Sequence, residues 1–207
     1  MTKTNKIVLI IAAHPDDEVL GCGGTILRHV ATNDSVHALF MTDGVSARDE
    51  NVEVLREKRL RAMETAKRVL GIQTIHHFDF PDNQMDTVPE LEIAKRVEAV
   101  VREVQPNVVY THHLGDLNID HRLTARASMV ACRPLPKSSV SEIYGFEILS
   151  STGWNAPLAD PFIPTMYVDI GGFLEKKIEA LMCYSDELRP APHARSVESL
   201  ACLAKYR

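Results

Sequence analysis

The sequence predicts an α/β fold with a mostly parallel β-sheet and helices on both of its faces. Apolar segments rich in β-branched residues alternate along the chain with charged segments of helical periodicity. The first apolar segment, residues 7–13 (IVLIIAA), contains no polar residue, which is typical of a strand that is covered on both faces. Alternation of this kind also implies right-handed crossovers between parallel strands.

Each expected element has its own boundary signals. The expected strands share a β-branched or aromatic composition, and they are residues 7–13, 36–44, 74–80, 107–113, 142–149 and 165–170. The expected helices show a periodic pattern, and they are residues 52–70, 89–104, 121–132 and 172–184. The first of these helices stops at Gly71 and the second stops before Pro106, which are both helix-ending signals.

Two segments are less regular. Residues 150–164 (SSTGWNAPLADPFIP) are expected to form a long surface loop, and long loops in compact domains are often functional. Residues 198–207 follow a helical pattern that stops without a capping signal. This pattern suggests that the chain is shortened at this end.

The length and composition indicate one soluble globular domain. The 207 residues favour a single domain over residues 1–207, with 45% hydrophobic and 25% charged residues. The net charge is −5 without a basic stripe, so no nucleic-acid partner is expected. The four cysteines include no CxxC pair. We therefore expect reduced thiols and a cytoplasmic location.

The N-terminal segment resembles a targeting signal only superficially. Lys3 and Lys6 precede the apolar run, but an acidic cluster follows it at once, so a first buried strand is the better interpretation. No apolar run approaches the roughly 20 residues that are needed to span a bilayer.

The first strand is followed directly by the motif HPDDE, residues 14–18. Pro15 suits the first turn of a helix, and acids in that turn complement the helix dipole. That structural role does not explain a histidine and two aspartates at the end of a buried strand, because crowded carboxylates need a neutralising cation. His14 and Asp17 are ordinary zinc ligands that can converge on one ion. Asp16 would then be free to accept a proton.

The fourth strand ends in a second polar motif, THHLGDLNIDHR, residues 111–122. A catalytic zinc usually takes three protein ligands and one water, and His121 is the predicted third ligand. Asp120 is expected to orient a ligand by a hydrogen bond. The alternative is that Asp120 only caps a helix that begins at His121.

Together these motifs resemble those of the PIG-L/LmbE-like family of zinc-dependent N-deacetylases. The resemblance rests on AHPDDE with the glycines that follow it, on TDG after the second strand, and on the later Asp-His pair, and it runs from about residue 6 to the end. It implies a Rossmann-like fold, removal of acetyl groups from N-acetylated sugars or related amides, and assembly into homo-oligomers, often trimers or hexamers. It further implies that His14, Asp17 and His121 bind zinc and that Asp16 is the general base. Iron, cobalt or manganese also suit two histidines and one aspartate.

The chain departs from the family pattern at one position. Members usually read His-Pro-Asp-His where this chain reads Asn118-Ile119-Asp120-His121, and that first histidine stabilises the oxyanion or serves as an acid. An asparagine amide can donate to an oxyanion but cannot transfer a proton. We therefore expect Asn118 as an oxyanion donor and His113 or His112 as a proton source.

Four further residues are candidate substrate contacts: Asp43, Arg48, Trp154 and His193. Asp43 ends the second strand, Arg48 could grip a hydroxyl or phosphate, and Trp154 could stack on a sugar face. His193 would contribute only if the C-terminal segment folds over the pocket. Each also has a structural explanation as a turn, a solvated arginine, a loop anchor or a surface histidine.

Three other functions fit the same motifs. The first is a metal hydrolase acting on a thiol-linked or non-sugar amide. The second is an inactive metal-bound ligand-binding protein, although retention of Asp16 argues against it because a binding protein needs no base. The third, a magnesium phosphohydrolase, is disfavoured by the two histidines, because Mg²⁺ prefers oxygen ligands.

Overall fold

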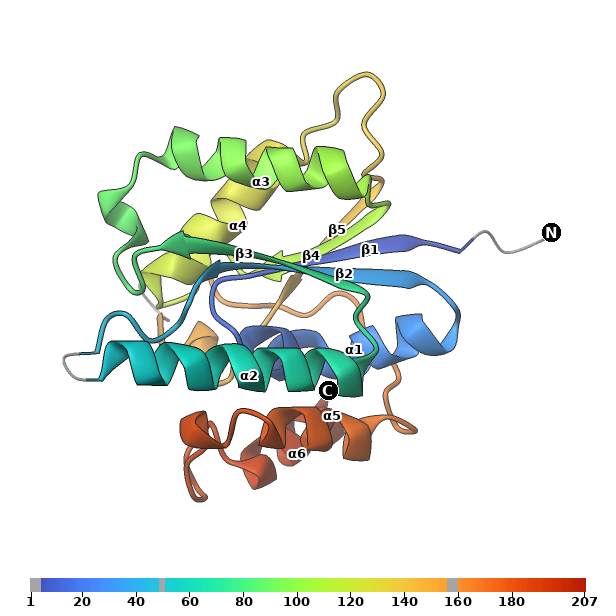
Figure 1. Cartoon of the computed structure of the whole chain (residues 1–207). Helices are drawn as coiled ribbons and strands as arrows, with labels where there is room; N and C mark the ends of the chain where they lie inside the picture. The colour runs from blue at the N-terminus through green and yellow to red at the C-terminus, as the bar shows by residue number, and fades with distance from the viewer. Residues whose placement is uncertain (1–4, 49–50, 156–159) are drawn as a thin grey trace.

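The fold is an α/β sandwich in which one parallel sheet lies between two helical layers (Figure 1). The computed structural model describes residues 5–48, 51–155 and 160–207. The strands are β1 (Ile7–Ala12), β2 (Ser35–Thr42), β3 (Thr74–Phe80), β4 (Val108–His112) and β5 (Glu142–Phe146). All pair in parallel, in the order β3-β2-β1-β4-β5. The predicted fold class is therefore confirmed.

The helices cover the sheet in two groups. They are α1 (Asp17–Ala31), α2 (Val52–Leu70), α3 (Glu90–Val104), α4 (Ile119–Ala131), α5 (Leu174–Met182) and α6 (Val197–Tyr206), with short 3₁₀ turns η1 (Met85–Thr87), η2 (Thr152–Asn155) and η3 (Ser185–Glu187). Helices α3 and α4 lie on one face of the sheet, and the other helices lie on the opposite face (Figure 1). Successive residues of β1 alternate between the two layers: Leu9 and Ile11 face α3 and α4, whereas Val8 and Ile10 face α1 and α2.

Most predicted boundaries agree with the structure to within a few residues. Helix α2 spans the predicted residues 52–70, and Gly71 ends it with a left-handed φ of 77°. Helix α4 begins at Ile119, earlier than predicted, because Asn118 is its N-cap and accepts from the backbone N–H groups of Asp120 and His121. The alternative that Asp120 caps this helix is therefore wrong.

The sixth predicted strand, residues 165–170, is not a strand in the structure. A strand needs a neighbouring ladder, and this segment finds its contacts on α1 instead. Ile170 lies so close to Gly24 that a Cβ on that glycine would clash with it, and Arg28 Nη1 donates to the carbonyl of Asp169 at 3.0 Å. The edge of β5 opposite β4 consequently has no strand partner among the described residues.

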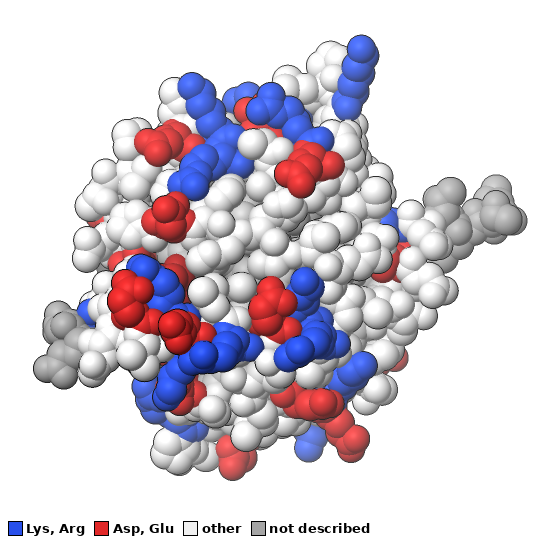
Figure 2. Space-filling view, in the orientation of Figure 1, with Lys and Arg blue, Asp and Glu red and all other residues white. Residues whose placement is uncertain are grey.

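The distribution of surface charge and the hydropathy of the helices indicate which kinds of partner are expected. Over α2 and α3, lysines and arginines lie beside aspartates and glutamates (Figure 2), so this face offers no extended basic area of the kind that follows a nucleic-acid backbone. No helix in the described parts of the chain is both long and apolar enough to cross a membrane. The four cysteines are free thiols.

Gly21 is needed where α1 meets the end of β5. A Cβ at this position would fall inside the van der Waals radius of the Phe146 ring. We predict that Gly21→Ala lowers the free energy of unfolding by about 1–3 kcal/mol through overpacking, measured by denaturant titration. The matched control is Gly153→Ala, because nothing lies within 4 Å of a Cβ there. Equal stability of both variants would show that the helix–strand contact adapts to the methyl group.

Candidate metal centre

The sheet topology brings the two polar motifs together. The chain changes winding direction between β1 and β4, which are hydrogen-bonded neighbours. Ligands of open α/β sheets bind at such a switch point, outside the carboxyl ends of the strands. The HPDDE motif follows β1 and the NIDH residues open α4 after β4, so residues more than 100 positions apart in sequence meet at one edge of the sheet.

His14, Asp17 and His121 form a compact buried group that could hold one metal ion. His14 Nδ1 lies 3.1 Å from Asp17 Oδ2, and His121 Nε2 lies 3.3 Å from both of these atoms. A tetrahedral zinc with bonds of about 2.0–2.1 Å separates its ligand atoms by roughly 3.3–3.4 Å. The three donor atoms therefore have the spacing that a single ion requires.

The electrostatics of this group favour a positive charge at its centre. Burial lowers the pKa of His14, but hydrogen bonds to Asp120, Asp17 and Asp82 outweigh burial and hold that pKa well above its usual range. Burial raises the pKa of Asp17, yet the facing His121 and other histidines hold it well below its usual range. Asp17 Oδ1 is also buried without a hydrogen-bond partner among the described residues. The site therefore attracts positive charge, and a cation held by Asp17 Oδ2 and the two histidines would supply it.

Carboxylates outside this group orient both histidines. Asp120 Oδ2 contacts His14 Nε2 at 3.1 Å and also accepts from the N–H of Asn83, while its Oδ1 accepts from the N–H of Met85. Asp116 Oδ1 lies 3.2 Å from His121 Nδ1. Such contacts leave His14 Nδ1 and His121 Nε2 to face a metal. An orienting role was expected for Asp120, whereas the contact of Asp116 with His121 was not predicted.

A second group, His14, Asp82 and Asp120, also has metal-binding spacing. It would use His14 Nε2, which lies 3.3 Å from Asp82 Oδ1. Both oxygens of Asp120 already accept backbone N–H groups. Asp17 Oδ2 likewise accepts one backbone N–H, that of His14 at 2.9 Å. The first group is the better candidate because its two histidines and one carboxylate match the ligand set of catalytic zinc sites.

Asp120→Asn is predicted to weaken metal binding by about 10–100-fold, because the amide can no longer hold the His14 ring in the required tautomer. The measurement is competition for zinc against a chromophoric chelator. Asp86→Asn is the matched control, since Asp86 is an exposed residue of nearby η1 and should bind as the wild type does. Unchanged affinity of Asp120→Asn would remove Asp120 from the metal centre.

Asp16 lies beside this group in an unusual backbone conformation. Its φ of 134° is disfavoured for a residue other than glycine, and its N–H donates to Glu18 Oε2 at 3.0 Å. Arg195 Nη1 donates to Oδ2 at 3.0 Å, whereas Oδ1 is buried with no hydrogen-bond partner in the described chain. Burial raises the pKa of Asp16 to about 6, although Arg195 opposes this shift. One carboxylate oxygen is thus left to accept a proton.

The other predicted site residues are not among the proposed metal ligands, and each has its own contacts. Asn118 Oδ1 caps α4 and its Nδ2 donates to Asn83 Oδ1 at 3.0 Å. Asp43 accepts from two backbone N–H groups of its own turn and from Arg56. Trp154 is 68% exposed in η2. His193 Nδ1 accepts from the backbone N–H of Arg195.

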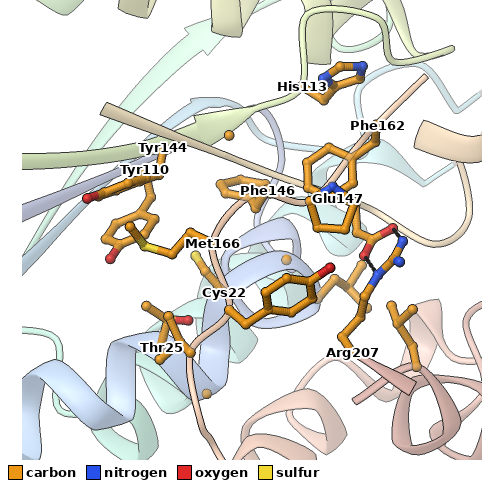
Figure 3. Close-up of a pocket in the computed structure, with 18 of the residues that line it drawn as sticks. Cys22, Thr25, Tyr110, His113, Tyr144, Phe146, Glu147, Phe162, Met166 and Arg207 are labelled. Atoms are coloured by element: carbon orange, nitrogen blue, oxygen red, sulfur yellow. Dashed lines mark hydrogen bonds and ion pairs between the residues drawn. The ribbon is translucent and has the colours of Figure 1, made fainter. Parts of the chain in front are cut away.

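His113 faces a separate cavity and is not part of the metal-binding group. Its Nε2 lies 2.8 Å from the Asp160 carbonyl and its ring contacts Phe162 edge-on. Both rings stand at a cavity of about 490 Å³ that borders β5, α1 and residues 161–168 (Figure 3). None of His14, Asp16, Asp17 and His121 lines this cavity. His112 Nε2 accepts from the Ala13 N–H at 2.9 Å and lies 3.5 Å from Asp17 Oδ2.

Three charged residues near Asp16 were not predicted as part of the site: Arg59, Glu187 and Arg195. Arg59 Nη1 donates to the Pro15 carbonyl at 2.6 Å, and Glu187 pairs with both arginines. No local sequence motif identifies these residues, because each lies in a segment whose charged side chains are expected to be exposed to solvent. Arg59 is a buried residue of α2, and only the folded structure shows this burial.

A parallel α/β sheet with two histidines and a carboxylate converging at its switch point defines a class of candidate metal-dependent hydrolases. Within that class, the chain belongs to the PIG-L (GlcNAc-PI de-N-acetylase) family, whose model matches residues 9–132. The family membership that the sequence motifs indicated is therefore confirmed.

Relatives of known name agree with this assignment. An uncharacterized deacetylase of Escherichia coli K12, YaiS, is 32% identical over 150 residues, which cover 70% of this chain and 76% of the relative. A probable N-acetyl-alpha-D-glucosaminyl L-malate deacetylase 2 of Bacillus anthracis is 24% identical over 195 residues, or 89% of this chain and 83% of the relative. The N,N'-diacetylchitobiose deacetylase structure from Pyrococcus horikoshii shares the fold, with a TM-score of 0.78 and 24% identity over 97% of this chain and 78% of that one.

Proposed function

We propose that this chain is a metal-dependent deacetylase that removes the N-acetyl group from an N-acetylated sugar or sugar conjugate. The observation that carries the proposal is the pairing of three converging ligand atoms with Asp16, which directly precedes the ligand Asp17 and whose buried Oδ1 has no hydrogen-bond partner among the described residues. Membership of a family of de-N-acetylases supports the reaction, and the sugar deacetylases among the relatives support the substrate class.

We assign the metal to His14 Nδ1, Asp17 Oδ2 and His121 Nε2, whose spacing and charge fit one ion. Zn²⁺ is the proposed metal, and Fe²⁺, Co²⁺ or Mn²⁺ suit the same ligands. A metal at this position supplies Lewis acidity and lowers the pKa of a water toward about 7.

Asp16 performs the proton transfers in this proposal. Its free Oδ1 accepts the proton of the water that attacks the acetamide carbonyl, and the protonated acid then delivers it to the leaving amine. Asn118 has one amide proton on Asn83, and its second proton is available to the developing oxyanion. With His113 turned to another cavity, Asp16 is the better proton donor to the amine.

Further proposals concern the contacts to the substrate and the assembly of the protein. Asp43, Arg48, Trp154 and His193 remain proposed contacts for the sugar or its conjugated group. Residues 1–207 are proposed to form one domain that acts in the cytoplasm as a homo-oligomer.

The test is acetate release from a panel of N-acetylated sugars, including lipid-linked and nucleotide-linked ones. Zinc-loaded protein should release acetate, and chelated protein should not until zinc is restored. If protein that binds zinc stoichiometrically releases no acetate from any compound of the panel, the sugar substrate is contradicted. That result would favour an amidase that acts on another amide.

A further inference from the structure

The general base proposed above is held by a residue from the far end of the chain. Arg195 lies just before α6, and its Nη1 donates to Asp16 Oδ2 at 3.0 Å. The two residues are 179 positions apart in sequence, and Asp16 is almost completely buried. The C-terminal segment therefore closes one side of the catalytic carboxylate.

The guanidinium group of Arg195 is fixed by partners other than Asp16. Its Nε donates to Ser150 Oγ at 3.2 Å, and its Nη1 lies 3.4 Å from Glu187 Oε2. Its backbone N–H donates to His193 Nδ1 at 3.0 Å. Ser150 and Glu187 hold the guanidinium group and His193 holds the backbone, so the arginine is oriented by the fold and does not simply follow the carboxylate.

Glu187 balances the positive charge that gathers here. It pairs with Arg48 at 2.5 Å, with Arg59 and with Arg195. Arg59 in turn donates to the Pro15 carbonyl and lies 3.8 Å from Asp16 Oδ2. The backbone before Asp16 and the side chain of Asp16 are thus each braced by an arginine.

A carboxylate needs such bracing because its terminal torsion is broad and roughly two-fold. Either oxygen could otherwise face the reacting water. A hydrogen bond to Oδ2 alone distinguishes the two oxygens and leaves Oδ1 as the one without a partner among the described residues.

We propose that Arg195 is a positioning residue that occupies Asp16 Oδ2 and thereby aims Asp16 Oδ1 at the reacting proton. The inference rests on the proposed deacetylase function, in which Asp16 is the base. It assigns to the C-terminal segment a role in catalysis that requires no contact with the substrate.

The kinetic test uses three variants of the full chain loaded with zinc. Arg195→Met removes the guanidinium donors but keeps an unbranched apolar stem, Arg195→Lys keeps a charged donor, and Arg189→Met is the matched control. Arg189 is an exposed arginine of the same segment that donates to the carbonyls of Asp186 and Leu188.

Misplacement of a catalytic group costs up to about 100-fold in rate. We expect Arg195→Met to lower kcat by about 10–100-fold with KM and zinc content unchanged, Arg195→Lys to recover part of the loss, and Arg189→Met to match the wild type. In an Asp16→Asn background, Arg195→Met should cause no further loss, because both act through one group. A raised KM with normal kcat, or an equal loss in that background, would overturn the proposal.

A structural readout separates this proposal from the function on which it rests. Crystal structures of the wild type and of both Arg195 variants should show one Asp16 orientation in the wild type, two or more in Arg195→Met, and the wild-type orientation in Arg195→Lys. If Asp16 keeps a single orientation in Arg195→Met, Arg195 does not position it. If no protein releases acetate while these orientations differ as expected, the deacetylase function fails and the positioning role stands.

Discussion

Replacement of Asp16 by asparagine should lower kcat by about 10²–10⁴-fold while the protein keeps its bound metal. The amide has the shape of the carboxylate and can still accept from Arg195, but it cannot take a proton. The three proposed metal ligands do not include Asp16. The measurement is acetate release together with the metal-to-protein ratio determined by elemental analysis.

The control for this variant is Asp86→Asn, which makes the same change at an exposed position in η1 and should leave turnover unchanged. Near-normal turnover of Asp16→Asn would show that another group is the base. Loss of metal together with turnover would place Asp16 among the ligands instead.

Replacement of Asp17 by asparagine should abolish stable metal binding and, with it, acetate release. Asp17 supplies the only anionic ligand of the proposed set, so the loss should exceed the about 10–100-fold expected for an orienting partner such as Asp120. The measurement is the shift in melting temperature on zinc addition, because a metal at 100 times its Kd stabilises the native state by about 2.7 kcal/mol. The wild type should show this shift and Asp17→Asn should not.

Asp16→Asn is the matched control for that experiment, because it makes the same change one residue away and should keep the full zinc-dependent shift. A zinc shift retained by Asp17→Asn would contradict the assigned ligands. It would indicate that His14, Asp82 and Asp120, which also have metal-binding spacing, hold the ion.

The sequence alone predicted the features that depend on local physics. The apolar runs correspond to strands of a parallel sheet, because burial on both faces requires uninterrupted apolar side chains. Helix α2 ends where Gly71 can adopt a left-handed conformation. The proposed ligands could also be predicted, because His14 and Asp17 lie in one turn and His121 lies in the first turn of the helix that follows a neighbouring strand.

The sequence misled where an element depends on a distant partner. Residues 165–170 have a strand-like composition, yet they lie against Gly24 and Arg28 of α1 and have no ladder to join. The start of α4 was predicted two residues too late for a local reason, because Asn118 and not Asp120 is its N-cap. Composition reports what a segment can do, and packing decides which of these options is realised.

The surroundings of the proposed base were determined only by the tertiary structure. Arg195 and Glu187 follow Asp16 by more than 170 residues, and Arg59 lies in a helix whose charges read as solvent-exposed. No periodicity or short motif relates such positions, because their proximity follows from the crossing of separate layers of the fold. The sequence thus determined the helices and strands and the types of residue proposed to bind the metal. The folded structure decided which charged side chains contact Asp16 and which of its oxygens has no hydrogen-bond partner among the described residues.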